Sequence, residues 1–494
     1  MYTQKSVVLI GAIIFVALLF PITLGAQITF ESTYGGTEND SGDSVQQTTD
    51  GGYIISGHTT SFGAGDYDIY LIKTDANGDP TWTKTYGGTS PDEAYSVQQT
   101  SDNGYIVAGN TMSFGPSFFS IYLLKTDSLG DTLWTKAHGW GFLTYCYSVQ
   151  ITSDSCYVIV GISQDYGEAP DVCLVKTDAN GDILWTQSYG GDDYDWAYSV
   201  QQTSDNGYII TGFTASYGAG AYDVYLIKTD SMGDTLWTKT YGGPNDEEGF
   251  SVRETQDGGY LIAGYTESFG AGSKDVYVIK TDSIGDTLWT KVIGGSGGDE
   301  AYSIQEISED EYIIAGYTSS FGSGNSDVYL IKIYSSGDTL WTRTFGGTGS
   351  DMGYSIQQTS DDGYIIAGQT ESFGAGTMDV YLIKTDSLGN VNVTGIENQP
   401  DDIPPKIYLS QNYPNPFNPT TTIKFTTENT ENAELIIYNI KGQKVKQFSI
   451  FNFQSSIVWD GTDQDHNQVS SGVYLYRIKS DDFVSETKKM ILLK

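Results

Sequence analysis

The sequence has few of the residues on which metal binding, nucleophilic catalysis and covalent crosslinking usually depend. Among 494 residues there are three histidines and three cysteines. The cysteines, Cys146, Cys156 and Cys173, lie in one short stretch without a CxxC spacing or a nearby histidine. An odd number cannot pair completely within one chain. We therefore predict no metal site and no cofactor, and attribute the cysteines to drift within one segment.

Basic residues are also scarce. The chain has 25 Lys and Arg against 62 Asp and Glu, a net charge of −37. Before residue 405 there are 15 basic and 53 acidic residues; after it there are 10 and 9. Binding of phosphates needs clustered Lys and Arg, so nucleic acid and anionic membrane surfaces are disfavoured as partners. Cations, basic proteins and neutral glycans remain as partner classes.

Long apolar runs are missing beyond the N-terminus. There, Lys5 precedes an apolar run from Val7 to Phe20, and Leu24-Gly25-Ala26 ends in a small residue suited to cleavage. The run is shorter than the roughly 20 residues of a spanning helix, and Pro21 follows it. We predict a cleaved signal peptide over residues 1–26 rather than a membrane anchor, and no transmembrane segment afterwards.

What the sequence has instead is a repeat rich in Gly and Tyr, with 59 and 37 copies of these residues. Glycine doublets such as Gly35-Gly36 and Gly87-Gly88 recur at intervals of about 52 residues. Each unit contains four short runs with period-2 alternation and β-branched residues, separated by Gly, Asp and Asn turns, which predicts four strands. Seven such units resemble a seven-bladed β-propeller. The predicted fold class is all-β, with this propeller spanning residues 27–391.

The seventh unit lacks its last strand. Residues 379–386 (DVYLIKTD) are present, but no LWTK follows. Residues 28–36 (ITFESTYGG) align with TLWTKTYGG, so we expect the N-terminal strand to complete the last blade and leave no open sheet edge. Large aromatic residues recur on this outer strand, and we predict that they dock each blade onto its neighbour. They are Phe30, Trp82, Trp134, Trp185, Trp237, Trp289 and Trp341.

The turn before each tryptophan, Asp-x-x-Gly-x-x-x-Trp, resembles the tryptophan-docking pattern of quinoprotein propellers and the Asp-box hairpins of sialidases. The stretch 75–79 (DANGD) has acidic residues in a spacing that suits calcium. The middle position is Leu129 and Met232 in two sister units, and neither side chain can ligate a cation. We therefore interpret the acidic residues as parts of tight hairpins.

The last ninety residues differ from the repeats in composition and in sequence motifs. A linker with three prolines, residues 392–405, precedes short alternating runs at 434–440, 456–460, 472–478 and 488–494, which predict a small Ig-like β-sandwich over residues 406–494. The stretches LSQNYPNPFNPTTTIKF (409–425), WDGTD (459–463), SSGVYLYRI (470–478) and TKKMILLK (487–494) closely resemble the C-terminal sorting domain, type A-like, of type IX (Por) secretion cargo. The resemblance implies export through the periplasm, interaction with the type IX machinery, and a location on or outside a Gram-negative cell.

Candidate catalytic residues are few. His58, His138 and His466 fall in unrelated contexts, and His58 is interpreted as a variable strand-end residue. The propeller has two arginines, Arg253 and Arg343, too few for the carboxylate clamp of a sialidase. Acidic residues recur between blades (92–93, 246–248 and 299–300), and we expect a solvated acidic rim there. Paired carboxylates for glycoside hydrolysis stay open because their separation is not visible in the sequence.

Aromatic residues break the repeat in blades two to four. We expect these residues to share one face and to form a ligand-binding surface, since exposed aromatic clusters often mark recognition sites and flat rings suit sugar stacking. They are Phe118, Phe119, Trp140, Phe142, Tyr194 and Trp196. Local repacking around a degenerate third blade is the alternative.

Three functions follow from these features. The first is a non-catalytic surface module for binding or adhesion, with a glycan or protein ligand, and not an enzyme. The second is a secreted polysaccharide-acting enzyme that uses carboxylates on the acidic propeller face. The third is a structural component of a surface layer.

Overall fold

The computed structural model describes residues 27–391, 407–409, 412, 415–427, 433–450, 456–465, 467–479, 485 and 487–493. The predicted signal peptide and linker, and His466, lie outside these residues. The chain divides into two compact units, residues 1–394 and 395–494. No helix occurs in the described residues, so the predicted all-β class is confirmed.

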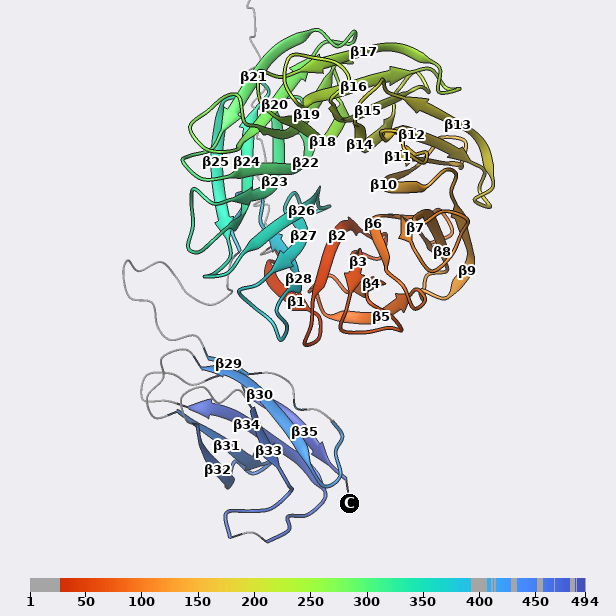
Figure 1. Cartoon of the computed structure of the whole chain (residues 1–494). Coiled ribbons are helices and arrows are strands. Elements are labelled where there is room, and N and C mark those ends of the chain that lie inside the picture. Colours follow the sequence, from red (N-terminus) through yellow and green to blue (C-terminus); the bar gives the residue numbers. More distant parts are fainter. Residues whose placement is uncertain are drawn as a thin grey trace, which may run out of the picture. The chain divides into compact units, whose positions relative to one another are not determined.

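The first unit consists of seven four-stranded antiparallel sheets arranged around a central opening (Figure 1). The innermost strands are β2 (Asp40–Gln47), β6 (Asp92–Gln99), β10 (Leu143–Ile151), β14 (Asp195–Gln202), β18 (Glu247–Glu254), β22 (Asp299–Ser308) and β26 (Asp351–Gln358). The second strands are β3 (Tyr53–Thr59), β7 (Tyr105–Thr111), β11 (Tyr157–Gln164), β15 (Tyr208–Thr214), β19 (Tyr260–Thr266), β23 (Glu311–Thr318) and β27 (Tyr364–Thr370).

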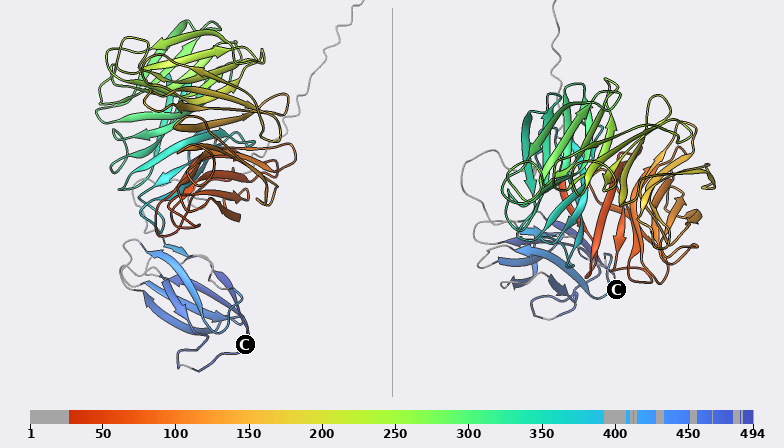
Figure 2. Two further views of the ribbon diagram at one scale, coloured as in Figure 1. Left: turned by 45° about the vertical axis from the view of Figure 1, so that its right-hand side comes forward. Right: turned by 45° about the horizontal axis from the view of Figure 1, so that its top comes forward.

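The third strands are fully apolar at their centres because both of their faces are covered by neighbouring blades. They are β4 (Asp68–Thr74), β8 (Ser120–Thr126), β12 (Asp171–Thr177), β16 (Asp223–Thr229), β20 (Asp275–Thr281), β24 (Asp327–Tyr334) and β28 (Asp379–Thr385). The outermost strands are β5 (Pro80–Tyr86), β9 (Thr132–His138), β13 (Ile183–Tyr189), β17 (Thr235–Tyr241), β21 (Thr287–Ile293), β25 (Thr339–Phe345) and β1 (Phe30–Tyr34). Figure 2 shows the strands of each blade running side by side in oblique view.

The N-terminal strand takes the outermost place in the seventh sheet. β1 pairs antiparallel with β28, with Phe30 opposite Lys384 and Tyr34 opposite Val380. On the inner side, Val45 N–H donates to Ser355 Oγ over 3.2 Å, which joins the first blade to the seventh. The sheet therefore contains the first and the last strands of the propeller, as the alignment of residues 28–36 with the LWTK strands predicts.

Inner strands are joined through repeated Ser and Gln side chains. The free edge of each inner strand presents N–H groups that need acceptors. Six glutamines meet this need by accepting, through Oε1, a backbone N–H of the next blade's inner strand; they are Gln46, Gln98, Gln150, Gln201, Gln305 and Gln357. Serines two residues earlier, such as Ser44 and Ser96, accept a second N–H. These hydrogen bonds between blades explain why the SVQQ motif recurs in the inner strands.

The aromatic residues of the outer strands contact the following blade. Trp237 lies 5.8 Å from the ring of Tyr260, and the same contact spans 5.9–6.3 Å for Trp82, Trp134, Trp185, Trp341 and Phe30. Trp289 instead donates from Nε1 to Ser335 O over 3.0 Å. The hairpin glycine of the next blade is required here: Gly285 has φ +80°, and a Cβ would lie 2.8 Å from Trp237.

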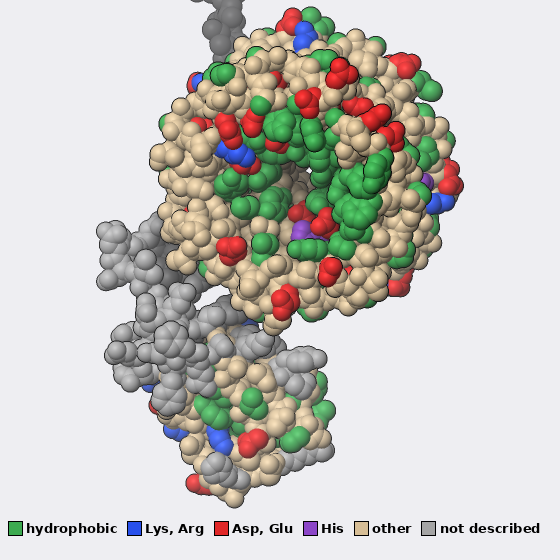
Figure 3. Space-filling model, in the orientation of Figure 1, with side chains coloured by type: hydrophobic (Ala, Val, Ile, Leu, Met, Phe, Trp, Pro, Cys, Tyr) green, Lys and Arg blue, Asp and Glu red, His purple; other side chains and the backbone are tan. Residues whose placement is uncertain are grey.

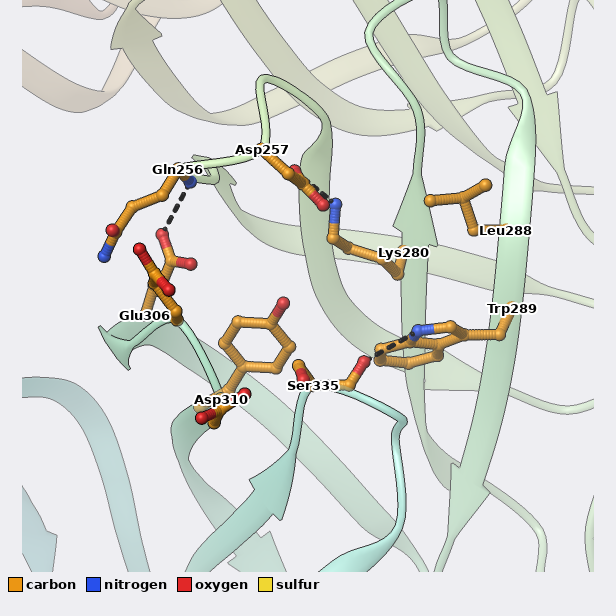
Figure 4. A pocket seen from close by; sticks show the side chains of 10 residues that line it. Gln256, Asp257, Lys280, Leu288, Trp289, Glu306, Asp310 and Ser335 are labelled. Carbon is orange, nitrogen blue, oxygen red and sulfur yellow. Dashed lines mark hydrogen bonds and ion pairs between the residues drawn. The ribbon is translucent and has the colours of Figure 1, made fainter.

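Lysines of the third strands lie at the interfaces between blades; six of the seven are buried, and Lys332 is partly exposed. Figure 4 shows one such place, where Lys280 pairs with Asp257 over 2.9 Å beside Trp289. These side chains line a cavity of about 450 Å³ between the fifth and sixth blades. A cavity of about 480 Å³ between the third and fourth blades has Lys176, Asp154 and Trp185 in the same places. These crevices therefore belong to the repeated scaffold.

The second unit contains two sheets. One has the order β29 (Ile407–Leu409), β30 (Thr421–Thr427) and β33 (Ser456–Trp459); the other has the order β32 (Lys444–Ile450), β31 (Ala433–Asn439), β34 (Gly472–Lys479) and β35 (Lys488–Leu492). Their shared core is centred on fully buried Trp459. Phe417 packs on Trp459 at 5.5 Å between ring centroids, and its N–H donates to Ile491 O. The NPFNP stretch is thus tied to the last strand.

Candidate functional site

A collar of aromatic rings surrounds the central opening of the propeller. It consists of the fourth residue of each inner strand, counted from the residue aligned with Asp40: Tyr95, Tyr147, Tyr198, Phe250, Tyr302 and Tyr354, with Asp43 in the first blade. Successive rings of neighbouring blades lie 4.9–5.4 Å apart. Each collar residue sits at a β-bulge, where the register between the first two strands shifts. The bulge turns one extra side chain toward the opening.

Above the collar lies the mouth, formed by the second residue of each inner strand: Ser41, Glu93, Tyr145, Trp196, Glu248, Glu300 and Met352. The residue type at this position differs from blade to blade, except that it is glutamate in three of them. Figure 3 shows hydrophobic side chains gathered around the opening, interrupted by acidic, lysine or arginine, and histidine side chains. The mouth is therefore divided into chemically different sectors.

The apolar sector is a continuous ladder of ring contacts through blades two, three and four. It runs from Tyr166 through Phe142, Phe118, Phe119, Tyr145, Tyr147, Trp196 and Phe213 to Tyr222, with centroids 4.5–6.3 Å apart. Phe118 and Phe142 stack in parallel at 5.7 Å. Tyr166, Phe118 and Phe142 are 88%, 54% and 37% exposed, so the outer end of the ladder offers ring faces to solvent.

Four of the six aromatics that we predicted belong to this ladder: Phe118, Phe119, Phe142 and Trp196. Tyr194 is exposed in the loop before β14 and has no ring contact among the described residues. Trp140 differs from the expectation, because it is half-buried and packs against the core cluster that contains Cys146. The acidic residue that binds the glycine doublet in the other blades is replaced by Thr144 in this blade. Thr144 Oγ1 accepts the N–H of Trp140 and donates to the Trp140 carbonyl oxygen.

The polar sector, in blades five and six, adjoins the blade-four end of the ladder and is built on two carboxylates and a lysine. Glu248 accepts hydrogen bonds from Tyr198 Oη (2.9 Å) and Tyr265 Oη (2.8 Å). Glu300 accepts from Tyr302 and Tyr317 and pairs with Lys274 Nζ at 2.8 Å. Burial raises the pKa of Glu248 above its usual value, and the nearby Glu300 charge adds to the shift, against the tyrosine hydrogen bonds and Lys274.

A third sector contains His58, which lies near the end of a strand at a position that varies between blades, as predicted. It lies within β3 opposite Ser41, and its Nδ1 is 3.3 Å from Oδ2 of Asp43, the one non-aromatic member of the collar. Burial alone would lower the pKa of His58, but the Asp43 carboxylate outweighs this and raises it. The histidine and the aspartate thus form a paired site where the aromatic collar is interrupted.

The expected solvated acidic rim is wrong. Asp92, Glu247 and Asp299 are fully buried, and Glu300 is 5% exposed. Asp92 Oδ2 accepts the N–H of Gly88 over 2.8 Å, and Glu247 does the same for Gly243. These carboxylates accept hydrogen bonds from backbone N–H groups of the glycine doublets. This structural role explains why acidic residues occur at these positions. A run of acidic residues in the sequence does not show whether the carboxylates bind the backbone or face solvent.

The remaining candidates are structural where described. The three cysteines are free, and burial raises the pKa of the Cys146 and Cys173 thiols. Asp75 Oδ1 accepts N–H groups of Asn77 and Asp79, as a hairpin interpretation predicts. Within the described ranges no group of three or more His, Cys, Asp or Glu is arranged to hold a metal ion.

Sequence reasoning missed the polar sectors. Alignment of the seven units by column would have found them, since Asp43 stands alone in an aromatic column and Glu248 and Glu300 share the column that holds Trp196. The charged residues stand out only when they are compared with the residues at the same position in the other blades. They do not stand out within the acidic chain as a whole. Their pairing with Lys274 requires contacts between neighbouring blades and could not be read from spacing.

Comparison with known proteins separates the two units. The regulatory protein FlaEY of Caulobacter vibrioides is 27% identical over 181 residues, covering 31% of this chain and 19% of its own length. The chain therefore spans about a fifth of that relative. Its function as a regulatory protein is a property of that protein as a whole.

Comparison with solved structures gives matches of low sequence identity. The periplasmic gluconolactonase PpgL of Pseudomonas aeruginosa is 11% identical, with 68% of this chain and 96% of that chain covered and a TM-score of 0.43. PorZ, a surface component of the type IX secretion system of Porphyromonas gingivalis, is 11% identical, with 94% and 85% covered and a TM-score of 0.26. Enzymes occur among such neighbours, and the likeness at these identities is one of fold.

The second unit gives a specific result. Residues 411–493 match the family described as the secretion system C-terminal sorting domain, which confirms the resemblance of the last ninety residues. Among the residues that the structure describes, none form a helix with the length and apolar content that crossing a membrane requires. The C-terminal unit is therefore a sorting domain of the type IX secretion system, and it directs a propeller protein to the outer cell surface.

Proposed function

We propose that the protein is a non-catalytic binding module at the cell surface, and that its ligand is an extracellular glycan held at the mouth of the propeller. The observation that supports this is the ladder of nine aromatic rings along one side of the mouth. At its exposed end, Phe118 and Phe142 stand at positions where the other blades have no aromatic residue. These two rings are therefore not required by the repeat, whereas Tyr166 occupies a position that is aromatic in every blade.

The chemistry of the mouth suits a sugar chain. Flat aromatic faces pack against the apolar faces of pyranose rings and carry specificity at little entropic cost. Sugar hydroxyls also need hydrogen-bond partners, and the tyrosine hydroxyls and carboxylates of the polar sector supply both donors and acceptors. The acidic character of the chain favours a neutral or basic glycan over an acidic one.

A glycan array probed with the full chain tests this proposal. We expect saturable binding of at least one glycan class, and loss of at least tenfold in affinity for Phe142→Ala and Trp196→Ala. Phe321→Ala is the matched control, because Phe321 is 46% exposed but belongs to the repeated loop and contacts Tyr329 at 5.8 Å. Equal binding by wild type and both mouth variants, or no glycan bound by the wild type, contradicts the proposal.

A secreted enzyme acting on polysaccharide is the second candidate, and one observation favours it. Glu248 has a raised pKa, whereas the neighbouring Glu300 is paired with Lys274. Two carboxyl groups whose environments differ in this way can serve as general acid and as charged partner. In that case, Glu248 would donate a proton to the leaving oxygen and Glu300 would stabilise the developing positive charge.

Product release decides between the two candidates. Incubation of the chain with the glycan that binds best should leave its reducing ends unchanged over many hours if the module is non-catalytic. Enzymatic release that disappears in Glu248→Gln and Glu300→Gln, with binding retained, would establish the enzyme instead. Phe321→Ala, the matched control of the binding test, should leave both binding and product release unchanged.

A further inference from the structure

A polar cavity, partly open to solvent, lies on the propeller axis below the collar. Its volume is about 260 Å³, and Ser, Val and Gln side chains of the inner strands line it from several blades. The repeated lining residues are those that join the blades, namely the serines at the fifth and the glutamines at the seventh position of each inner strand. The cavity is distinct from the mouth, which is formed by the second residues of the same strands.

Hydrogen-bond donors face this cavity because the acceptors are already used. Each of the six glutamines turns its Oε1 to a backbone N–H of the next blade, which only the oxygen of the amide can accept. The Nε2 group therefore lies on the other side of each planar amide. No acceptor for these six Nε2 groups is recorded within residues 27–391. The ring thus presents up to twelve N–H bonds around the axis.

In the remaining blade, the fifth, Arg253 occupies the position of the glutamine. Its Nη1 donates to Val252 O over 2.8 Å, which leaves four of its five N–H donors for other partners. The cavity lining contains no Asp or Glu, and within the described residues Arg253 has no ion pair. Burial lowers the pKa of Arg253 with no carboxylate offsetting the shift. Arg253 is half-buried, and a half-buried charge without a carboxylate partner is suited to binding an anion.

The geometry points to an anion site: we propose that Arg253 and the ring of glutamine amides bind a small oxyanion, carrying a carboxylate, sulfate or phosphate group, inside the axial cavity. A guanidinium matches two oxygens of such a group with parallel N–H bonds. The amide nitrogens would bind the remaining oxygens. The site does not rest on the glycan proposal, because it uses none of the mouth residues.

Calorimetric titration of the full chain with sodium sulfate, sodium phosphate and sodium acetate tests this site, with ionic strength held constant by sodium chloride. We expect saturable 1:1 binding of at least one anion and a rise in melting temperature with its concentration. Arg253→Gln, which restores the glutamine of the other six blades, should weaken binding at least tenfold. It should not destabilise the fold, because it provides an acceptor for the Glu306 N–H.

Two further variants keep the proposal falsifiable. Arg343→Gln removes the same charge from an arginine that lies over Trp341, outside the cavity, and should bind as wild type does. Gln98→Glu keeps the acceptor for the Ile151 N–H but adds a negative charge to the cavity lining that repels an anion, so it should also abolish binding. Absence of saturable binding by the wild type, or unchanged affinity in both Arg253→Gln and Gln98→Glu, overturns the anion site.

Discussion

The repeated and the unrepeated positions of the inner strands have different physical roles. At the seventh position the side chain is Gln in six blades, because the next blade's backbone N–H needs an acceptor at that place. At the second position, only five residues earlier, the side chain is Glu, Tyr, Trp, Ser or Met. The backbone makes no such demand at the mouth, so these side chains are free to vary with the ligand.

This difference teaches where function is found in a repeat protein. Residues that recur in six of the seven blades, such as the outer-strand tryptophans and the buried lysines, satisfy contacts that the blades share. Residues that depart from their column, such as Trp196, Asp43 and Arg253, have no structural reason to be there. Substitutions in the first group should change stability, and those in the second should change ligand binding.

The largest expected effect concerns the repeated tryptophans. Trp237→Ala removes the ring that packs on Tyr260 and Gly285 of the next blade, and we expect the free energy of unfolding to fall by about 3 kcal/mol. Denaturant or thermal unfolding measures this. Leu236→Ala is the control: Leu236, the residue before Trp237, is 57% exposed, and a change within about 0.5 kcal/mol is expected. Equal losses for the two variants would contradict a docking role.

The glutamine ring should have the next largest effect. Gln98→Leu leaves the Ile151 N–H without its 2.8 Å acceptor, and we expect a loss of about 2 kcal/mol because an unsatisfied buried donor keeps its desolvation cost. Glu93→Gln changes a mouth residue in the same strand and should cost less than about 1 kcal/mol, since the amide still accepts from Tyr95. If the mouth variant is the less stable of the two, the comparison fails.

A pH-dependent effect is expected from the ion pairs between a turn aspartate and the buried third-strand lysine of the same blade. The pKa of Asp205 is lowered from 3.8 to about 2 against its desolvation, by hydrogen bonds that include Lys228. Because the folded-state pKa lies below the unfolded one, its contribution to stability is present above about pH 4 and is lost as the pH falls toward about 2. Asp205→Asn keeps the turn acceptors and should reduce that loss by about 1 kcal/mol, after allowance for solvent screening.

Unfolding of wild type and Asp205→Asn at a series of pH values measures the effect. Asp171, Asp327 and Asp379, whose pKa values are raised by burial, contribute the opposite trend, but they are the same in both proteins and cancel in the difference. Asp286→Asn, which removes a carboxylate from the more exposed pair with Lys239, is the control and should follow wild type. Parallel curves for wild type and Asp205→Asn would refute the assignment.

The smallest effect on stability is expected at the outer end of the ladder. Tyr166→Ala removes a side chain that is 88% exposed, so the free energy of unfolding should change by less than about 0.5 kcal/mol. Its ring contacts Phe142 at 5.0 Å, so glycan affinity should nevertheless fall. A thermal melt together with a binding titration of the same sample separates the two readouts. Unchanged affinity would move the ligand away from this end.

Much of the fold was predictable because the repeat exposes it. The 52-residue period, the LWTK strands and the alignment of residues 28–36 were enough to give seven blades and the place of β1. Phe118, Phe119, Phe142 and Trp196 were found as departures from the repeat. Trp140 departs equally but is packed against the core, because sequence comparison cannot distinguish a repacked position from an exposed one.

The rest of the site depends on geometry that the sequence does not show. A β-bulge at the fourth position of each inner strand adds one residue to one strand of the pair, so simple alternation assigns Asp43 and the collar tyrosines to the wrong side. The acidic residues split in the same way, with Asp92 buried under a glycine doublet and Glu93 at the mouth beside it. Adjacent letters thus have unrelated roles.

Binding of glycans by the full chain and by a Phe142→Ala/Trp196→Ala double variant, with melting temperatures measured on the same samples, tests the central claim most directly. The account predicts that the wild type binds a glycan, that the double variant loses this binding, and that both melt within a few degrees of each other. A double variant that binds as the wild type does, or that loses binding only because it no longer folds while single variants bind normally, would contradict it.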